Sequence, residues 1–369
     1  MSAEYAVYLA DEWGDRIATL DGYQALTWTR RVNDIGQLRM AFGPGDFDPA
    51  WWGLDRRVQV WRKADGGAFR LCRVYLLRMR DRGYDEEGRY TQIIGGPDLN
   101  EYLRRRQIAY AAGSSQASKN TYADDLLAAL ARENLANLAS TGRDITGLGF
   151  SVYDTLSSVA VLSKGCSWRN LLTVLQEVCA TMREEHGTSL YFDIVEYPGP
   201  TALQFRVYWG QRGSDRVAGF GGSQQIFSIE RGNLAEPRLV EDWTEEVNYI
   251  YGAGQGLGAE RTIVEVQDAD RVALTRNNRC EATFEGAGYS TTEHLTSAAR
   301  ARLAEGRPVI AFSGTVPDVE GSRFQRDWDF GDRVTAEFEG ERFTCEIMAV
   351  RATVADGRET VEARIAYAG

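Results

Sequence analysis

The stretch VNYIYGAGQGLGAERTIVEV, residues 247–266, places four glycines between two apolar runs: Gly252, Gly254, Gly256 and Gly258. Read from Gly254, it fits the relaxed G-x-G-x-x-G/A pattern of dinucleotide sites. That pattern binds a pyrophosphate only where it leads into a helix, whose N-terminal amides hold the phosphates. Here ERTIVEV follows, and its alternating β-branched residues predict a strand. The glycines therefore indicate a structural β-hairpin that binds no cofactor.

Short strand-like runs occur on both sides of this hairpin. QALTWTR and QLRMAF are examples from the first hundred residues, and DRVTAEFE and ETVEARIAYA are examples from the end of the chain. Clusters of Gly, Asp and Pro separate many of these runs. This spacing is typical of an antiparallel barrel or sandwich and not of βαβ units.

Helical periodicity is concentrated in the middle of the chain. Leucines near one face predict a helix over residues 121–138, with Thr121 as its N-cap. A stronger pattern predicts a helix over 167–186, between an N-cap at Ser167 and a terminating glycine at Gly187. The middle of the chain is therefore expected to mix helices with strands.

A third helix is expected at about 292–305, ending at Gly306. With strands before and after the helical middle, the predicted fold class is α+β and β-rich. The changes of pattern divide the chain into a β-barrel-like region at 1–96, an α+β region at 97–215 and a C-terminal β-rich region with one helix at 216–369.

Composition excludes several classes of protein. The 369 residues carry 42 basic and 53 acidic side chains, a net charge of −11, which disfavours sequence-independent binding of nucleic acid. Five cysteines without a CxxC pair favour free thiols in a protein assembled in the cytoplasm. The N-terminus does not resemble a signal peptide, and no apolar run approaches the ~20 residues of a membrane span. We therefore expect a soluble chain that does not insert into membranes.

The motifs predict no catalytic, cofactor or metal site. The two histidines, His186 and His294, accompany no G-x-S-x-G elbow, and the DFG triplet at 329–331 lacks the other kinase motifs. The surrounding DWDFGD does not fit an EF-hand loop and favours a polar turn before a strand. Because carboxylates pair in space and not in sequence, a glycan-active hydrolase stays open as an alternative.

Two short runs are candidates for an interface. Trp51 and Trp52 in PAWWGL are expected to close the end of a barrel or to pack at an interface. They could also stack on a sugar, so a carbohydrate-binding β-protein is a further alternative. Arg104, Arg105 and Arg106 form the densest basic run, which in an acidic chain predicts a solvated face or an intersubunit patch.

Four segments, taken in order, resemble the tail-hub family of long-tailed siphophages and prophages, also called baseplate-hub or tail-tip proteins. They are LDGYQALTWTRRVNDIGQLRMAF (20–42), IIGGPDLNEYLRRRQIA (93–109), EVNYIYGAGQGLGAER (246–261) and FQRDWDFGDRVTAEFEGERFTCEIMAVRATV (324–354). Two departures stand out: Phe330 occupies the place of the family's leucine, and Gly96-Pro97-Asp98 replaces Gly-Arg-Asp. The likeness spans nearly the whole chain.

The resemblance implies a phage tail-hub fold, in which tail-tube-like antiparallel β-barrels flank an intervening α+β domain. It also implies a structural and non-enzymatic role in the virion, at the tail tip. Three subunits, each with two barrels, would form a ring around the DNA channel. The implied partners are the distal tail protein ring, the tape-measure protein and a tail fibre or spike, with DNA passing without specific binding. From the acidic net charge we expect a channel lining that repels DNA.

Overall fold

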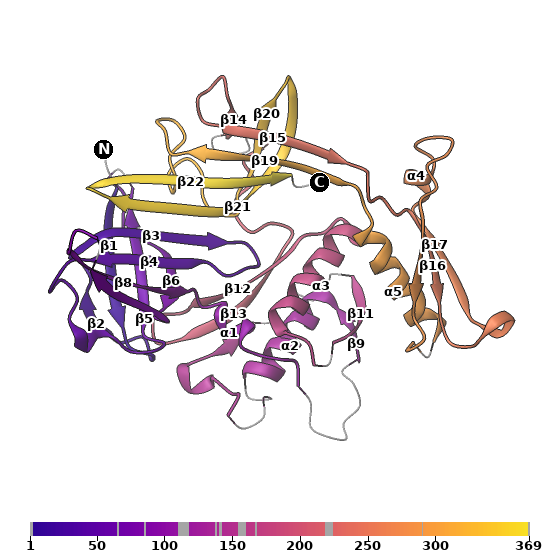
Figure 1. The fold of residues 1–369 in the computed structure, drawn as a ribbon, viewed down its shortest axis with the longest axis horizontal. Helices are drawn as coiled ribbons and strands as arrows, with labels where there is room; N and C mark the ends of the chain where they lie inside the picture. Colours follow the sequence, from indigo (N-terminus) through magenta and orange to yellow (C-terminus); the bar gives the residue numbers. More distant parts are fainter. Residues whose placement is uncertain are drawn as a thin grey trace.

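The computed structural model of the chain describes residues 3–64, 66–84, 86–109, 118–136, 139, 142–153, 160–166, 168–217, 224–289 and 291–367. Figure 1 shows a β-rich body made of the two ends of the chain, in indigo and yellow, with two helix-containing parts beside it. The β-rich α+β fold class predicted from the sequence is confirmed.

The N-terminal part folds into a first barrel. Its strands are β1 (Glu4–Ala10), β2 (Arg16–Thr19), β3 (Tyr23–Arg31), β4 (Gln37–Phe42), β5 (Arg57–Lys63), β6 (Arg70–Leu76), β7 (Met79–Tyr84) and β8 (Tyr90–Pro97), with a 3-10 turn η1 (Pro49–Trp51). The sheet β2-β1-β5-β6 shares a buried core with β3, β4 and β8. Alternation along the strands explains this packing, because Leu38, Met40 and Phe42 of β4 are buried while Gln37 and Arg39 face outward.

The middle of the chain is an α+β domain with its own core. It contains α1 (Glu101–Arg104), β9 (Ser118–Tyr122), α2 (Ala123–Leu135), η2 (Thr146–Leu148), β10 (Ser151–Val152), β11 (Val161–Gly165), α3 (Leu171–His186), β12 (Leu190–Glu196) and β13 (Leu203–Trp209). Helices α2 and α3 pack on each other beside the sheet β10-β13-β12. Leu175 and Met182 of α3 are fully buried, as the helical pattern of the sequence predicts.

Two predicted helix starts are wrong. Helix α2 begins at Ala123, because Thr121 pairs with Leu162 as part of β9; Leu138, at the other end of the predicted helix, lies outside the described residues. Helix α3 begins at Leu171 and is capped by Asn170, whose side chain accepts a hydrogen bond from the Thr173 amide at 3.4 Å; the predicted cap, Ser167, lies outside the described residues. The backbone just before α3 is bonded to the segment around Ile108, which holds residues 168–170 out of the helical conformation.

The end of α3 and both ends of the third helix agree with the prediction. Gly187 ends α3 in the left-handed conformation, with a φ of 58° that favours glycine. The third predicted helix is α5 (Thr292–Glu305), which ends at Gly306.

The C-terminal part forms a second barrel and carries an insert. The barrel strands are β14 (Ile226–Ser228), β15 (Ala235–Asp242), β19 (Val309–Pro317), β20 (Arg333–Phe338), β21 (Glu341–Ala355) and β22 (Arg358–Tyr367). The insert lies between β15 and β19 and contains β16 (Tyr249–Ala253), η3 (Gly258–Glu260), β17 (Ile263–Gln267), α4 (Ala269–Val272), β18 (Glu281–Glu285) and α5. In Figure 1 it projects from the body as a separate orange unit.

One sheet runs through both barrels. Its order is β15-β19-β22-β21-β3-β4-β8-β7, and the two ends of the chain meet where β21 pairs with β3, with Thr353 opposite Thr27. A single buried cluster fills both barrels, and Trp28 of the first barrel contacts Phe324 of the second at a ring-centroid distance of 6.1 Å. The regions 1–96 and 216–369 therefore share a sheet and a core.

Candidate assembly surface

The sheet shared by the two barrels has ten strands, of which the eight from β15 to β7 form a continuous run, called here the eight-strand sheet, while β20 and β14 branch from β21. One face of the eight-strand sheet is turned away from the shared core. Thr27, Thr353 and Thr360 stand in one row across β3, β21 and β22, and the hydroxyls of the first two lie 3.3 Å apart. The neighbouring residue on each strand, such as Trp28 or Val361, is buried in the core. The sheet thus presents a broad, polar, solvent-facing surface.

This outer face is rich in arginine. The strand registers place six exposed arginines on it against three exposed acids; the arginines are Arg31, Arg39, Arg238, Arg351, Arg358 and Arg364, and the acids are Asp81, Asp242 and Glu362. Within the described part of the chain, only Arg31 among these arginines forms an ion pair, with Asp34 at 3.3 Å. The face therefore carries a positive charge, although the whole chain has a net charge of −11.

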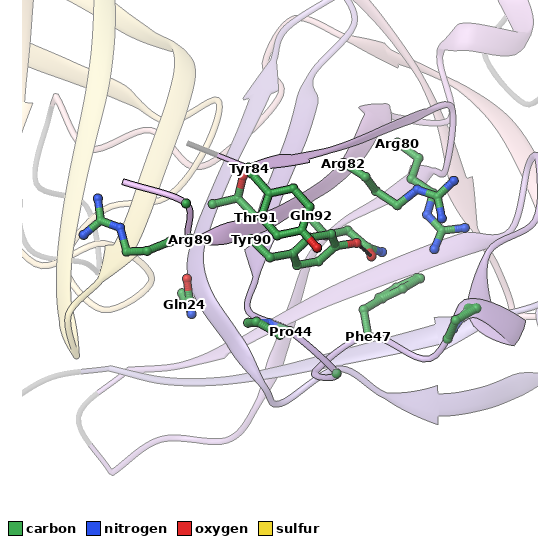
Figure 2. A pocket seen from close by; sticks show the side chains of 13 residues that line it. Gln24, Pro44, Phe47, Arg80, Arg82, Tyr84, Arg89, Tyr90, Thr91 and Gln92 are labelled. Atoms are coloured by element: carbon green, nitrogen blue, oxygen red, sulfur yellow. Dashed lines mark hydrogen bonds between the residues drawn. The ribbon is translucent and has the colours of Figure 1, made fainter. Parts of the chain in front are cut away.

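Strand β7 forms one edge of the sheet, and a basic groove lies beside it. The groove holds about 1050 Å³ and is lined by Arg80, Arg82 and Arg89 together with Phe47, Tyr84 and Tyr90, among others. Figure 2 shows these side chains along β7, β8 and the loop that contains Pro44 and Phe47. Tyr84 is 76% exposed. Among the described residues, no Asp or Glu lines this groove.

Strand β15 forms the opposite edge of the sheet, and the groove beside it is acidic. This groove holds about 410 Å³ and is lined by Glu241, Glu339 and Glu341 on an apolar floor of Leu239, Ile310, Phe338, Phe343 and Tyr367. The rings of Phe312 and Phe343 stack below it at a centroid distance of 4.8 Å. The two edges of the sheet thus differ in charge.

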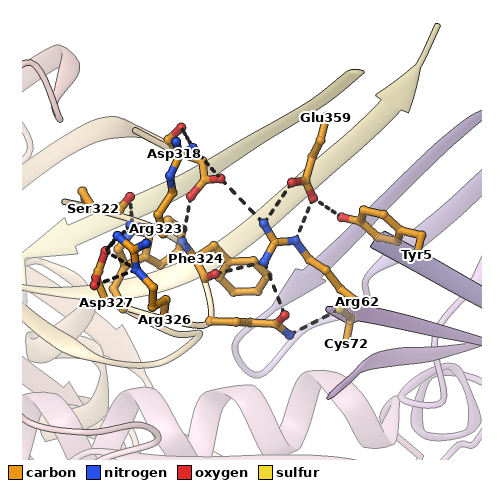
Figure 3. A network of polar contacts seen from close by, with 12 residues as sticks. Tyr5, Arg62, Cys72, Asp318, Ser322, Arg323, Phe324, Arg326, Asp327 and Glu359 are labelled. Atoms are coloured by element: carbon orange, nitrogen blue, oxygen red, sulfur yellow. Dashed lines mark hydrogen bonds and ion pairs between the residues drawn. The ribbon is translucent and has the colours of Figure 1, made fainter. Parts of the chain in front are cut away.

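A buried ion pair joins the two barrels. Arg62 of β5 donates two hydrogen bonds to Glu359 of β22, at 2.7 and 2.9 Å, and a third to the carbonyl of Phe324 at 2.9 Å. Asp318 lies 3.6 Å from the same guanidinium, and the Tyr5 hydroxyl donates to Glu359 (Figure 3). Burial favours the neutral guanidinium, but the bonds to Glu359 outweigh it and raise the pKa of Arg62.

A second buried cluster fixes the middle domain against the first barrel. Asp193 of β12 accepts hydrogen bonds from Arg73 at 2.5 Å, Arg212 at 3.1 Å and Arg30 at 3.3 Å. Arg73 also donates to Asp98 at 2.8 Å. Burial alone would raise the pKa of Asp193, but the surrounding arginines hold it at about 2. The middle domain is therefore held in one orientation by paired buried charges.

Glu196 closes a third joint of the same kind. It accepts hydrogen bonds from Gln59 at 2.8 Å and from the buried Arg57 at 3.4 Å, which links β12 to β5. Burial raises the pKa of Glu196 to about 7, even though Arg57 acts in the opposite direction. The carboxyl of Glu196 therefore changes its charge near neutral pH.

The predicted tryptophans lie close to the basic edge. Trp51 packs edge-on against Phe47, with 5.6 Å between ring centroids, and the guanidinium of Arg80 lies 5.7 Å from the Trp52 ring. Both tryptophans are half-buried against the shared core. A role of Trp51 and Trp52 at an interface stays a prediction.

The arginine run is used inside the subunit. Arg105 donates two hydrogen bonds to Asp55, at 2.9 and 3.0 Å, and a third to Glu101. Arg104 pairs with Glu101 as well, and Arg106 donates to the carbonyl of Arg143. The run fastens α1 to the first barrel, away from the two grooves.

The glycine segment lies in the insert, where β16 and β17 pair as an antiparallel hairpin. Gly256 and Gly258 have φ values of 101° and 57°, which an L side chain adopts only with strain. Gly252 and Gly254 are needed for a different reason, because a Cβ at either would come within 2.8 Å of Val264 or Leu295. The glycines were expected to supply positive φ values and close approach in a hairpin; Gly256 and Gly258 have the positive φ values, and Gly252 and Gly254 leave room for side chains of β17 and α5.

The remaining motifs and the buried cysteines have structural roles. The DWDFGD segment is a turn in which Asp332 accepts hydrogen bonds from the amides of Ser214 and Asp329. Burial raises the pKa of the thiols of Cys72, Cys179 and Cys345 to about 12. The described residues contain no group of His, Cys, Asp and Glu that could hold a metal ion. In the same residues, no helix has the length and apolar character of a membrane span.

The arginine face and the edge strands were missed in the sequence. ETVEARIAYA does alternate charged and apolar residues, so one charged face of β22 was readable. Its neighbours across β21 and β3 were not, because those strands lie about three hundred residues apart in the chain.

Two barrels that share a sheet, with an α+β domain packed beside them, are the fold of phage tail proteins. A 43 kDa tail protein of prophage MuSo2 from Shewanella oneidensis has a TM-score of 0.58 and 14% identity, over 100% of this chain and 99% of that one. A tail protein from Neisseria meningitidis MC58 has a TM-score of 0.58 and 13% identity, over 98% and 96%. Prophage tail protein gp18 from Listeria monocytogenes EGD-e has a TM-score of 0.54 and 12% identity, over 98% and 94%.

The chain belongs to the family of siphovirus ReqiPepy6 Gp37-like proteins, whose model matches residues 6–366. It is a phage tail protein, and the family resemblance inferred from the four sequence segments is confirmed. A search of curated proteins found no match.

Proposed function

We propose that this protein is the hub of the phage tail tip. In this proposal three copies form a ring that continues the tail tube, lines the DNA channel and joins the distal tail protein ring to a fibre or spike. The tape-measure protein would contact the same ring, and the subunit would have no enzymatic activity. The observation that carries the proposal is the continuous eight-strand sheet with two open edges.

The direction of the strands suits closure into a ring. All seven neighbouring pairs along the sheet are antiparallel, from β15-β19 to β7-β8. Because the number of strands is even, β7 of one copy and β15 of the next would also run antiparallel. Three copies would then close a sheet of 24 strands without a break in the pattern, and a closed sheet leaves no edge exposed.

The stagger of the strands suits the same ring. The strand registers can be followed from each edge to β3 in the middle of the sheet. Met79, at the start of β7, lies in the same row of paired residues as Thr27, and Ala235, at the start of β15, lies in the same row as Arg31. From there the edge strands run apart, so their centres are displaced by about ten residues, or about 33 Å along the strands. Seven spacings across the sheet amount to about 34 Å, which gives a strand tilt of about 45°.

This tilt sets the dimensions of the closed ring. In a closed ring with strands tilted by about 45°, each copy is displaced from its neighbour along the strand direction. This displacement is about equal to the width of eight strands, near 38 Å. A 24-stranded barrel at this tilt has a backbone diameter of about 50 Å and, after side chains, a bore of about 40 Å. Such a bore admits duplex DNA.

The charged face would line the channel. The expectation of an acidic lining came from the net charge of the chain, whereas this face carries six arginines and three acids. The arginines would contact DNA phosphates weakly and without sequence preference, and salt would release that contact steeply. This supports passage of DNA with brief, non-specific contacts.

Cryo-electron microscopy of the assembled tail tip tests the proposal. We expect threefold rings in which both barrels of each copy lie at the same radius around a pore. A monomer at the tip, or a pore lined by one barrel per copy, would refute the hub proposal.

A further inference from the structure

We propose that two copies of this chain join through the basic edge at β7 and the acidic edge at β15. The inference rests on the proposed ring, and it goes further by naming the surfaces and charges that select the neighbour. The basic edge is defined by Arg80 and Arg82, and the acidic edge by Glu241, Glu339 and Glu341.

The basic edge is open and its charge is not neutralised. Arg82 is exposed and forms no ion pair in the described part of the chain. Arg80 stacks on the rings of Phe47 and Trp52 at 5.8 and 5.7 Å, and its buried Nε has no hydrogen-bond partner. A buried donor without a partner is costly, so a carboxylate beside β7 would stabilise this edge.

The acidic edge offers the matching groups. Glu241 lies on β15 itself, while Glu339 and Glu341 belong to the β20–β21 turn beside it. None of the three forms an ion pair within the described residues, whereas Glu337 on the same hairpin is paired with Arg342. Three carboxylates in one groove repel one another, and a basic neighbour would relieve that repulsion.

Strand faces agree with this pairing. Arg80, Arg82 and Tyr84 alternate with Asp81 along β7, so they point away from the arginine face. Leu239 and Glu241 likewise alternate with Arg238 and Asp242 along β15. On the side of the sheet opposite the arginine face, Arg80 and Arg82 of one copy would therefore meet Glu241 of the next. On the arginine face itself, Asp81 would meet Arg238. Two copies joined this way add a strand to each other's sheet, with backbone hydrogen bonds across the joint.

Charge reversal tests the inference. We would measure self-association by sedimentation velocity over a series of protein concentrations, for the wild type and for Arg82→Glu, Glu241→Arg and the double variant. Each single reversal is expected to raise the concentration for half-assembly at least tenfold, and the double variant is expected to recover most of the loss. Arg364→Glu changes an exposed arginine at the centre of the sheet and serves as the matched control, with assembly unchanged.

The outcomes separate the inference from the hub proposal. Unchanged assembly in both single variants, or no recovery in the double variant, would refute the joint while leaving a ring formed by other surfaces. An edge that accepts a strand from a different tail protein would give the first of these results. A wild type that stays monomeric at every concentration would also refute the joint, and images of the tail tip would then decide the hub proposal independently. Equal melting temperatures show that the variants are folded.

Discussion

Loss of the charge on Glu359 should weaken the contact between the two barrels and lower the free energy of unfolding. The side chains of Arg62 and Glu359 are only 3% and 8% exposed, so Glu359→Gln leaves a buried guanidinium without its carboxylate. Breaking a buried pair in this way typically costs about 3–5 kcal/mol. Asp318 at 3.6 Å and the Phe324 carbonyl at 2.9 Å remain as partners, so we expect a cost of about 3 kcal/mol.

The double variant Arg62→Met/Glu359→Leu should be much less damaging than either single change. Apolar replacement of a buried ion pair is often neutral or stabilising, because neither charge then has to be desolvated. Urea unfolding followed by tryptophan fluorescence would give the three free energies. Their combination should yield a coupling of roughly 2–3 kcal/mol between the two side chains.

The exposed pair between Glu337 and Arg342 provides the control. Arg342 is 67% exposed, so Glu337→Gln should cost less than about 0.5 kcal/mol. A cost for Glu359→Gln as small as this control would refute the reasoning, since it would mean that the buried pair does not hold the barrels together.

Three further predictions concern the middle domain and the insert. The wild type should lose stability as the pH rises from about 4.5 to 7, because the raised pKa of Glu196 in the folded state favours its protonated form there. Glu196→Gln should remove this pH dependence, which thermal unfolding at several pH values would measure as a change of up to about 3 kcal/mol in the free energy of unfolding. Leu175→Asp should unfold the middle domain by burying a charge, whereas Ala180→Asp on the exposed face of α3 should cost no more than about 1 kcal/mol; equal losses by circular dichroism would contradict the helix register. Gly256→Ala should lower the melting temperature of the insert, since its Cβ would lie 2.4 Å from the Glu260 carbonyl oxygen at a φ of 101°, while Gly288→Ala, where nothing lies within 4 Å, should leave it unchanged.

Features that depend only on neighbouring residues could be predicted from the sequence. Alternation of apolar and polar residues predicted strands such as β4 and β22, and helical periodicity predicted the buried face of α3. Gly187 predicted the end of α3. Each of these patterns depends only on residues a few positions apart in the chain. The strand after the glycine segment was predictable for the same reason, since β-branched alternation in ERTIVEV does not depend on distant contacts.

Tertiary structure alone decided where those elements meet. Residues 168–170 look like the start of a helix, but backbone bonds to the segment at 106–108 hold them in a non-helical conformation and move the start to Leu171. Thr27 and Thr353 stand opposite each other although more than three hundred residues separate them, and no local pattern encodes such a pairing. The arginine face and the two oppositely charged edges exist only after that sheet has formed, because they assemble side chains from strands at both ends of the chain.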